Sequence, residues 1–256
     1  ELIASEIYRA AGVPAARCSH AVVSLNGRKL GFYYLKEGYD SGFIKANFAN
    51  AGGNFYDGGF LQDIDRDLEL EPGKKDPMKD RAELKAVVAM CKEPDKARRF
   101  RKLEQMIDMD KFLLMCAVQV ITFDWDGYAL KPNNYRVYHD PKLNKLTFIP
   151  SGMDQLWGDQ GYPVLPGFNG MLARAIIETD PGRERYLAKF REVTERAFPA
   201  DLPKLIDALK GRLRADLESV DKGLANNVLG NLDGVRNAVL NRAKNVNEQL
   251  KKMGKK

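Results

Sequence analysis

Apolar residues recur with a helical period at the start of the chain and with a strand period shortly after it. Residues 1–11 carry apolar side chains every three to four positions, which predicts an amphipathic helix that ends at Gly12. Residues 18–37 form two β-rich runs on either side of Asn26 and Gly27, the turn sequence most typical of a β-hairpin. The chain is therefore predicted to open with a helix and a hairpin.

The pattern is weaker over the next forty residues. Residues 40–60 are rich in glycine and aromatic side chains, which predicts a loop with a short strand at residues 54–57. Residues 61–80 are acidic and then marked by proline and glycine, which predicts an exposed excursion. Helices dominate the pattern from Arg81 onward.

Two helices and a second hairpin occupy the middle of the chain. Residues 95–107 predict a helix with a basic face. Residues 111–122, capped by Asp108 or Asp110, are apolar nearly all round, and a helix of this kind is buried. Residues 133–150 alternate on both sides of a polar turn, which predicts a β-hairpin.

The last third of the chain is predicted to be helical after a glycine- and proline-rich loop. Strands early and in the middle, followed by a run of helices, indicate the α+β class. The expected helices cover residues 169–178, 181–198, 202–219 and 233–253.

Composition and charge narrow the classes of function only slightly. The formal net charge is +6, and residues 201–256 hold twelve Lys and Arg against seven Asp and Glu. These basic residues are scattered without interleaved aromatics, so a solvated helix face is favoured over nucleic-acid binding, which is unlikely. No apolar run approaches the roughly 20 residues of a membrane helix, so we expect no membrane span.

Cysteine and histidine usage argues against several kinds of catalytic site. The three cysteines, Cys18, Cys91 and Cys116, have no metal-binding spacing. Cys91 and Cys116 lie in apolar helical patterns typical of core residues. Only two histidines occur in the chain, which argues against a histidine-based metal site or a Ser/His/Asp triad.

A polar segment, FDWDGYALKPNNY, separates the predicted buried helix from the second hairpin. Asp126 follows the helix, Asn133 and Asn134 precede the first strand, and Asp154 follows the second strand. If the two strands pair, their outer ends lie side by side and bring Asn134 and Asp154 to the loop of Asp126. We therefore expect three loops to converge at the rim of a packed unit.

Carboxylate and amide oxygens in one place suit a hard cation such as Mg²⁺. Phosphoryl transfer needs such a metal, an Asp that accepts the hydroxyl proton, and an Asn and Asp that hold the metal. The gap between Asp126 and the asparagines differs from the ordinary kinase motif. The alternative interpretation is structural. Asp126 would then lie in a turn, the asparagines would close a loop, and Asp154 would cap a short helix.

Several motifs resemble the CotH family of spore-coat-type atypical protein kinases. They are ASEIYRAAGVPAARCSHAVVSLNGRKLGFYYLKEGYDSGFIKANF, GNFYDGG, WDGYALKPNNYRVYHDP, FIPSGMDQLWG and LNRAKNVNEQL, in order over nearly the whole chain. The resemblance implies a diverged protein-kinase-like fold. It also implies an ATP- and Mg²⁺-dependent activity that phosphorylates Ser or Thr of secreted or coat proteins.

The resemblance also implies roles for individual residues. Asp126 matches the catalytic base and Asn134 a metal ligand, with Asn133 as its possible substitute. Asp154 matches the second acidic residue of a metal-binding element. On the nucleotide side the matching residues are Tyr34 and Glu37, and Trp157 is a candidate for stacking on adenine or for the core.

The chain departs from the family pattern at three places. Gly152 stands where many members have the first acidic residue of the metal-binding element, which predicts a single-metal site or weaker affinity. Ser41 and Asp57 stand where members often carry Lys. The β-rich segment that precedes the first helix in the family is not seen before residue 1.

These departures leave two functions open. The first is a protein kinase in which residues 1–60 form a partial nucleotide-side lobe, residues 61–160 carry the active site, and residues 161–256 complete the same catalytic domain. The second is an inactive or truncated CotH-like protein that serves in the assembly of a coat or envelope. The expected location, secreted or in the cell envelope, follows from the resemblance alone.

Overall fold

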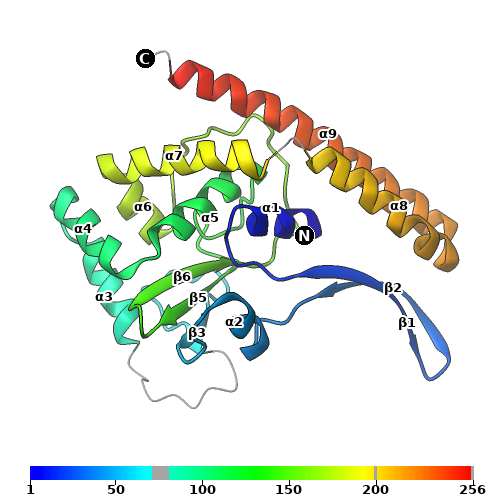
Figure 1. Ribbon diagram of the computed structural model, residues 1–256, viewed down its shortest axis with the longest axis horizontal. Helices are drawn as coiled ribbons and strands as arrows, with labels where there is room; N and C mark the ends of the chain where they lie inside the picture. Colours follow the sequence, from blue (N-terminus) through cyan, green and yellow to red (C-terminus); the bar gives the residue numbers. More distant parts are fainter. Residues whose placement is uncertain (71–80, 199–200, 255–256) are drawn as a thin grey trace.

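Helices and two small antiparallel sheets build the molecule, as the computed structural model in Figure 1 shows for residues 1–70, 81–198 and 201–254. The expected α+β class is therefore confirmed. The strands are β1 (Cys18–Leu25), β2 (Arg28–Lys36), β3 (Asn54–Asp57), β4 (Glu69–Leu70), β5 (Tyr135–Asp140) and β6 (Lys145–Pro150). The helices are α1 (Leu2–Ala10), α2 (Ser41–Asn47), α3 (Ala82–Cys91), α4 (Lys96–Met106), α5 (Met109–Thr122), α6 (Met171–Ile177), α7 (Asp180–Arg196), α8 (Leu202–Val220) and α9 (Lys222–Met253).

The first hairpin, β1 and β2, forms where the sequence predicts it. Asn26 and Gly27 adopt φ values of 50° and 78°, the left-handed backbone that a tight hairpin turn requires and that Asn and Gly tolerate best. The hairpin extends away from the rest of the molecule at its turn (Figure 1). Its base adjoins α1 and α8.

The second sheet has the strand order β4-β3-β5-β6, with every pair antiparallel. Tyr135 pairs with Pro150 at one end of the β5–β6 hairpin, and Asp140 pairs with Lys145 at the other. The backbone N–H of Ser151 donates to the carbonyl of Asn134 over 3.0 Å and extends the ladder by one residue. This pairing fixes the two chain segments that flank the candidate site.

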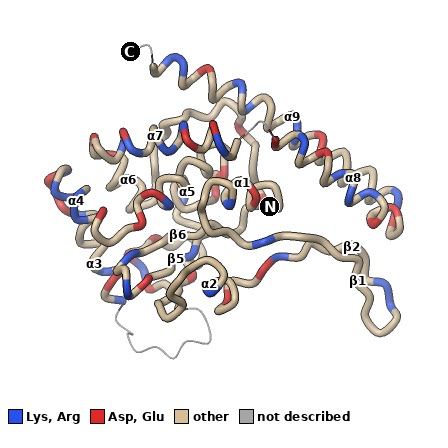
Figure 2. The backbone as a smooth tube through the Cα atoms, viewed as in Figure 1, with Lys and Arg blue, Asp and Glu red and all other residues tan. Residues whose placement is uncertain are grey.

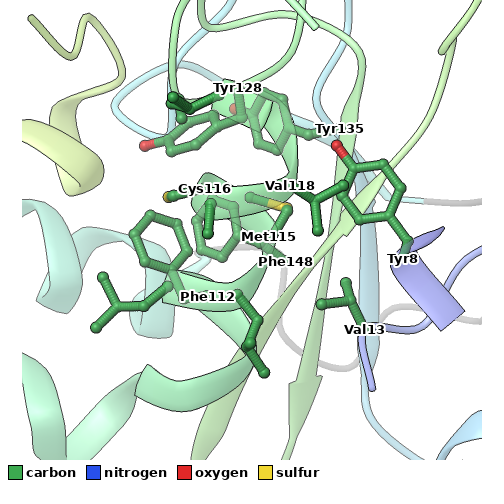
Figure 3. Packing of buried hydrophobic residues seen from close by; sticks show 14 of the residues in the cluster. Tyr8, Val13, Phe112, Met115, Cys116, Val118, Tyr128, Tyr135 and Phe148 are labelled. Carbon is green, nitrogen blue, oxygen red and sulfur yellow. The ribbon is translucent and has the colours of Figure 1, made fainter. Parts of the chain in front are cut away.

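Helix α5 is the buried helix that its sequence predicts. Asp108 caps it by accepting a hydrogen bond from the Lys111 backbone N–H, and nearly every side chain from Met109 to Thr122 is buried. Phe112 packs against Phe148 of β6 with ring centroids 5.0 Å apart. Figure 3 shows Tyr128, from the loop after α5, in the same aromatic cluster. The helix therefore joins the sheet to the helical half of the molecule.

Two predictions for residues 40–70 are corrected. Residues 41–47 form α2, because Asp40 caps the helix and Phe43 and Ile44 enter a small core beside the sheet. Residues 61–70 are not wholly exposed, since Ile64 and Leu68 are buried and β4 pairs with β3. Residues 71–80 of the expected excursion lie outside the described part of the chain.

Helix α9 begins at Lys222, eleven residues before its predicted start at residue 233. Two glycines and several asparagines in this stretch favour a loop when the sequence is considered locally. However, Ala225 and Leu229 are buried where α9 packs along α8. Tertiary burial of an apolar face therefore outweighs the weak local helix preference.

The surface of the helical third agrees with the expected solvated face. Figure 2 shows Lys and Arg interleaved with Asp and Glu along α8 and α9. Within the described residues, no helix has the length and apolar character needed to cross a bilayer. One hydrophobic cluster contains residues of α1 and of helices α3 to α9. The three predicted segments, residues 1–60, 61–160 and 161–256, therefore all contribute to the main core. The predicted segment boundaries themselves stay predictions.

Candidate active site

Asp126 lies in a compact loop between α5 and β5. The helix ends at Phe123, which adopts a left-handed φ of 50°. The loop then folds back on itself, because Gly127 N–H donates to the Asp124 carbonyl and Lys131 N–H donates to the Gly127 carbonyl. These backbone bonds hold Asp126 at the rim of the packed core.

Both predicted asparagines contact Asp126 directly. Asn133 Nδ2 and Asn134 Nδ2 each donate a hydrogen bond of 2.9 Å to Asp126 Oδ2. An ionised carboxylate only accepts hydrogen bonds, so the amide nitrogens must face it and the amide oxygens must point elsewhere. Asn134 adopts a φ of 49°, which Asn tolerates better than most residues.

The two asparagines differ in what remains available to a ligand. Asn133 Oδ1 accepts a hydrogen bond from Leu61 N–H over 3.1 Å, so both ends of this amide are engaged. Asn134 Nδ2 also lies 3.3 Å from the Gly152 carbonyl oxygen. Asn134 Oδ1 accepts no hydrogen bond from any described residue, which makes Asn134 the better metal ligand of the two.

The second oxygen of Asp126 is buried but accepts no hydrogen bond of good geometry among the described residues. Lys131 Nζ lies 3.3 Å from this Oδ1 as an ion-pair partner. The same ammonium lies 4.8 Å from the ring centroid of Trp125, within the range of a cation–π contact. Oδ1 is therefore the oxygen that remains able to accept a proton from a ligand.

Asp154 lies on the neighbouring loop, and its side chain is exposed. Its backbone N–H donates to the Gly152 carbonyl, the group that Asn134 also approaches. No described contact joins the Asp154 carboxylate to Asp126 or Asn134. The structure thus brings together Asp126, Asn133 and Asn134. Asp154 shares only the Gly152 carbonyl with Asn134, and no described contact joins its side chain to the three residues.

Asp154 opens onto a largely apolar cavity of about 380 Å³. The cavity lies between α1, the first hairpin and the α8–α9 pair, so segments far apart in the sequence build its walls. The polar groups of its lining come from Glu1, from the first hairpin and from Asp154. The lining residues are Glu1, Leu2, Ile3, Ser19, His20, Phe32, Tyr34, Asp154, Leu209, Leu213, Leu232 and Val235.

Gly152 has no space for a side chain. Its φ is +59°, and a Cβ atom at this position would lie 2.6 Å from both Cγ and Oδ1 of Asn134. The acidic residue that the family often carries here would therefore displace Asn134. Asn134 can take its present position because residue 152 has no side chain.

The predicted nucleotide-side residues lie on or next to β2. Tyr34 donates a hydrogen bond from its hydroxyl to Cys18 Sγ over 2.6 Å and lines the cavity beside Asp154. Glu37 accepts hydrogen bonds from the backbone N–H and the guanidinium of Arg17, which lowers the pKa of Glu37 although burial opposes the shift. Tyr34 therefore adjoins the candidate site, whereas Glu37 is engaged by Arg17.

Trp157 occupies the core position that the sequence left as its alternative. Its side chain is buried, its ring stacks on Phe198 with centroids 6.0 Å apart, and its backbone N–H donates to the Thr122 carbonyl. An adenine ring would have to replace Phe198 to stack on the same face. Trp125, next to Asp126, is the exposed tryptophan of the pair.

Sequence reasoning missed Asp124 and Lys131. Burial raises the pKa of Asp124 to about 7, the carboxylates of Asp126 and Asp154 add to the rise, and a hydrogen bond from the Tyr8 hydroxyl opposes it. Asp124 thus links α1 to the loop of Asp126. Its position directly after a buried helix was the available signal for burial.

The side chains at the site include oxygen ligands of the chemical kind that a hard divalent cation prefers. Among the described residues, no three His, Cys, Asp or Glu side chains lie close enough to hold a metal ion. Asn134 Oδ1 and the exposed carboxylate of Asp154 are oxygen ligands of the kind that Mg²⁺ takes, with water completing the coordination. The predicted single-metal site stays a prediction.

Comparisons with known proteins connect this geometry to a family. A family model described as CotH kinase protein matches residues 1–246. The inner spore coat protein H of Bacillus subtilis (strain 168) is 25% identical in an alignment over 230 residues, and the match covers 82% of this chain and 62% of that protein. The invasin CotH3 of Rhizopus delemar is 36% identical over 56 residues, 22% of this chain and 9% of that protein. The chain thus spans less than two thirds of the length of either relative.

Proposed function

Since this chain belongs to the CotH kinase protein family, we propose that it is a Mg²⁺-dependent protein kinase that transfers the γ-phosphoryl group of ATP to Ser or Thr. The single observation that carries the proposal is the state of Asp126. Two amide nitrogens hold its Oδ2, while its Oδ1 accepts no hydrogen bond among the described residues. A carboxylate that is fixed at one oxygen, and whose other oxygen faces only the side chain of Lys131, is suited to orient a hydroxyl group once that lysine moves away.

The chemistry assigned to the chain's own residues is mainly positioning. Asp126 Oδ1 accepts the proton of the acceptor hydroxyl. At the same time the hydroxyl oxygen of the acceptor bonds to the γ-phosphorus, and the bond between this phosphorus and the leaving ADP oxygen breaks. Lys131 now lies at this Oδ1 and must yield that position to the acceptor. Asn134 and Asp154 would hold Mg²⁺, which when bound neutralises phosphate charge.

The names of the relatives support a proposal for the acceptor and for the location. One relative is named a spore coat protein and the other an invasin, both of which indicate a surface or coat. We propose that the acceptor is a secreted or envelope protein and that this chain acts in the same place. The apolar cavity beside Tyr34 and Asp154 is the proposed place for the nucleotide base.

A non-catalytic binding or assembly module of a coat or envelope is the second candidate. The observation that favours it is the exposed carboxylate of Asp154, which contacts neither Asp126 nor Asn134 among the described residues. Titration of the purified chain with ATP and Mg²⁺ separates the candidates. Absence of binding at millimolar nucleotide would support the assembly module.

Phosphate transfer from radiolabelled ATP, to the chain itself and to casein, tests the kinase proposal. We expect Asp126→Asn and Asp154→Asn to abolish transfer with unchanged circular dichroism, because each removes one carboxylate at the rim of the core. Asp159→Asn is the matched control, since Asp159 is a nearby exposed acid that only accepts a loop hydrogen bond from Gly161. Transfer that survives in both test variants would refute the assignment of Asp126 and Asp154.

A further inference from the structure

Large apolar side chains that are exposed on the described residues gather at two places. One group covers the first hairpin, and the other lies on segments connected to Asp126. Trp125, exposed by 37%, precedes Asp126 in the chain, and Phe60 (77%) and Leu61 (46%) lie on the loop that bonds to Asn133. The remaining members, which lie apart in the β5–β6 turn and along α9, are Leu143, Leu224 and Leu240. The group at Asp126 is therefore distinct from scattered surface residues, which are common in folded proteins.

A side-chain amide connects the loop of Phe60 and Leu61 to the candidate catalytic residue. Leu61 N–H donates to Asn133 Oδ1, and the other end of this amide donates to Asp126 Oδ2. Gly58 N–H donates to the Tyr135 carbonyl and holds the start of the loop on β5. The loop thus has a fixed position beside Asp126.

The backbone of this loop is strained. Leu61 has a φ of 54°, in the left-handed region that branched aliphatic residues rarely adopt. Such a conformation persists only where the surroundings determine it, and it occurs preferentially at functional sites. Here the hydrogen bond to Asn133 holds the strained residue and keeps its side chain half exposed.

Charge does not explain what the loop presents to solvent, because its acidic side chains are already engaged. Asp57 pairs with Arg136 over 2.8 Å, and Asp63 accepts hydrogen bonds from the Tyr128 hydroxyl and from backbone N–H groups. The other two pairs are Asp65 with Arg66 and Asp67 with Arg81. The pairs of Asp65 and Asp67 are exposed and lie further along the loop, so the groups presented nearest to Asn133 are the apolar side chains of Phe60 and Leu61.

We propose that Phe60, Leu61 and Trp125 form a docking surface for an extended segment of the acceptor protein, one that carries an apolar side chain two residues from its Ser or Thr. The inference rests on the proposed kinase function. A hydroxyl that reaches Asp126 Oδ1 brings its neighbouring residues onto the surface around Asp126. In an extended segment, side chains two residues apart point to the same face and are separated by about 7 Å, so the side chains two residues before and after the hydroxyl fall on the surface flanked by Trp125 and the Phe60 loop.

A positional peptide library with a central serine is the probe. We expect peptides with Leu, Ile or Phe two residues from the serine to be phosphorylated best. The test variants are Phe60→Ser and Leu61→Asn, the second chosen because Asn tolerates a left-handed backbone. Each should raise the KM for the best peptide roughly tenfold with unchanged kcat, since the contact is the same in the ground and transition states. Leu143→Ser is the matched control, because Leu143 is 69% exposed at the far end of the β5–β6 hairpin.

Direct binding separates this inference from the kinase proposal. Fluorescence anisotropy of peptides that carry Leu, Ile or Phe two residues from the centre, with the serine replaced by alanine, measures docking without transfer. Binding that weakens roughly tenfold in Phe60→Ser but not in Leu143→Ser supports the docking surface even if no phosphate is transferred. Any of three results would overturn the docking surface. They are transfer with no preference for apolar residues in the peptide, equal binding in all variants, and no bound peptide in the library.

Discussion

Asn134 Nδ2 lies 2.9 Å from Asp126 Oδ2, and this hydrogen bond closes the loop between α5 and β5. The bond orients the amide so that Asn134 Oδ1 faces away from the carboxylate. It also fixes Asp126 by one oxygen only. The relationship between these two residues determines which atoms the site offers to a metal ion and which to an acceptor hydroxyl.

Replacing the amide by a carboxylate tests the metal site without an activity assay. Asn134→Asp would place two acidic groups at hydrogen-bond distance, so we expect the metal-free protein to lose about 2 kcal/mol of stability at neutral pH. Mg²⁺ should restore this loss by binding between the charges. The measurement is the Tm in EDTA and in MgCl₂, with Asn231→Asp on the surface of α9 as the control. Equal Mg²⁺ effects in both variants would contradict the site.

Gly152 tests whether the missing acidic residue limits the site. Gly152→Asp should lower phosphate transfer at least tenfold, because its Cβ displaces Asn134 and its backbone must keep a left-handed φ at a cost of about 1 kcal/mol. Gly152→Ala should have a similar effect. Gly167→Ala serves as the control, since a Cβ there has no neighbour within 4 Å. Higher transfer in Gly152→Asp would show that the acidic residue is tolerated and useful.

Asp124 predicts a pH dependence of stability. Burial raises the pKa of Asp124 to about 7, above its value of roughly 4 in an unfolded chain. The folded state therefore binds the proton more tightly. The resulting stabilisation is fully present below about pH 4 and is lost as the pH rises to about 7.

The variant Asp124→Asn stays uncharged and should remove this slope. The stability of this variant relative to the wild type should be greater at pH 8 than at pH 5, by about 3 kcal/mol, because the wild type loses about 1.4 kcal/mol per pH unit between pH 5 and pH 7. Urea titrations of both proteins at the two pH values measure the difference. An identical difference at pH 5 and pH 8 would mean that Asp124 does not titrate in this window.

Arg242 predicts a large loss of stability on substitution. This buried residue of α9 donates hydrogen bonds to the carbonyl oxygens of Val120 and Ile121 at the end of α5, and to two loop carbonyls. Arg242→Met would leave these acceptors without a donor and cost roughly 3 kcal/mol. Arg236→Met, which removes an exposed ion pair with Asp207, should cost less than about 1 kcal/mol. Denaturant unfolding compares the two, and similar losses would contradict the prediction.

Local sequence was sufficient where the chemistry of one short segment selects the conformation. Asn26 and Gly27 adopt the left-handed backbone of a hairpin turn, and Asp108 caps α5. The apolar run of α5 is buried as predicted, because no face of this helix is polar enough to contact water. Asp126 and Asn134 were placed together correctly, since a paired hairpin leaves few positions for the loop that precedes it.

Local sequence was insufficient where distant segments compete for the same residues. Helix α2 and the first turns of α9 form because the sheet and α8 bury their apolar faces. Phe198, more than forty residues away, stacks on Trp157 and covers the ring that was a candidate for adenine. The exposed position of Asp154 likewise depends on the loop geometry at Gly152.

The sequence by itself determined the α+β class, both hairpins, the buried helix, the family and the meeting of Asp126 with the asparagines. Each of these follows from the periodicity of a segment, from turn chemistry or from a motif. Only the tertiary structure decided that one oxygen of Asp126 accepts no hydrogen bond, that Gly152 has no room for a side chain, and that Asp124 is buried beside Tyr8. The physical reason is that burial and steric contact depend on which distant segments pack together, and that information is not present in any single stretch of the chain.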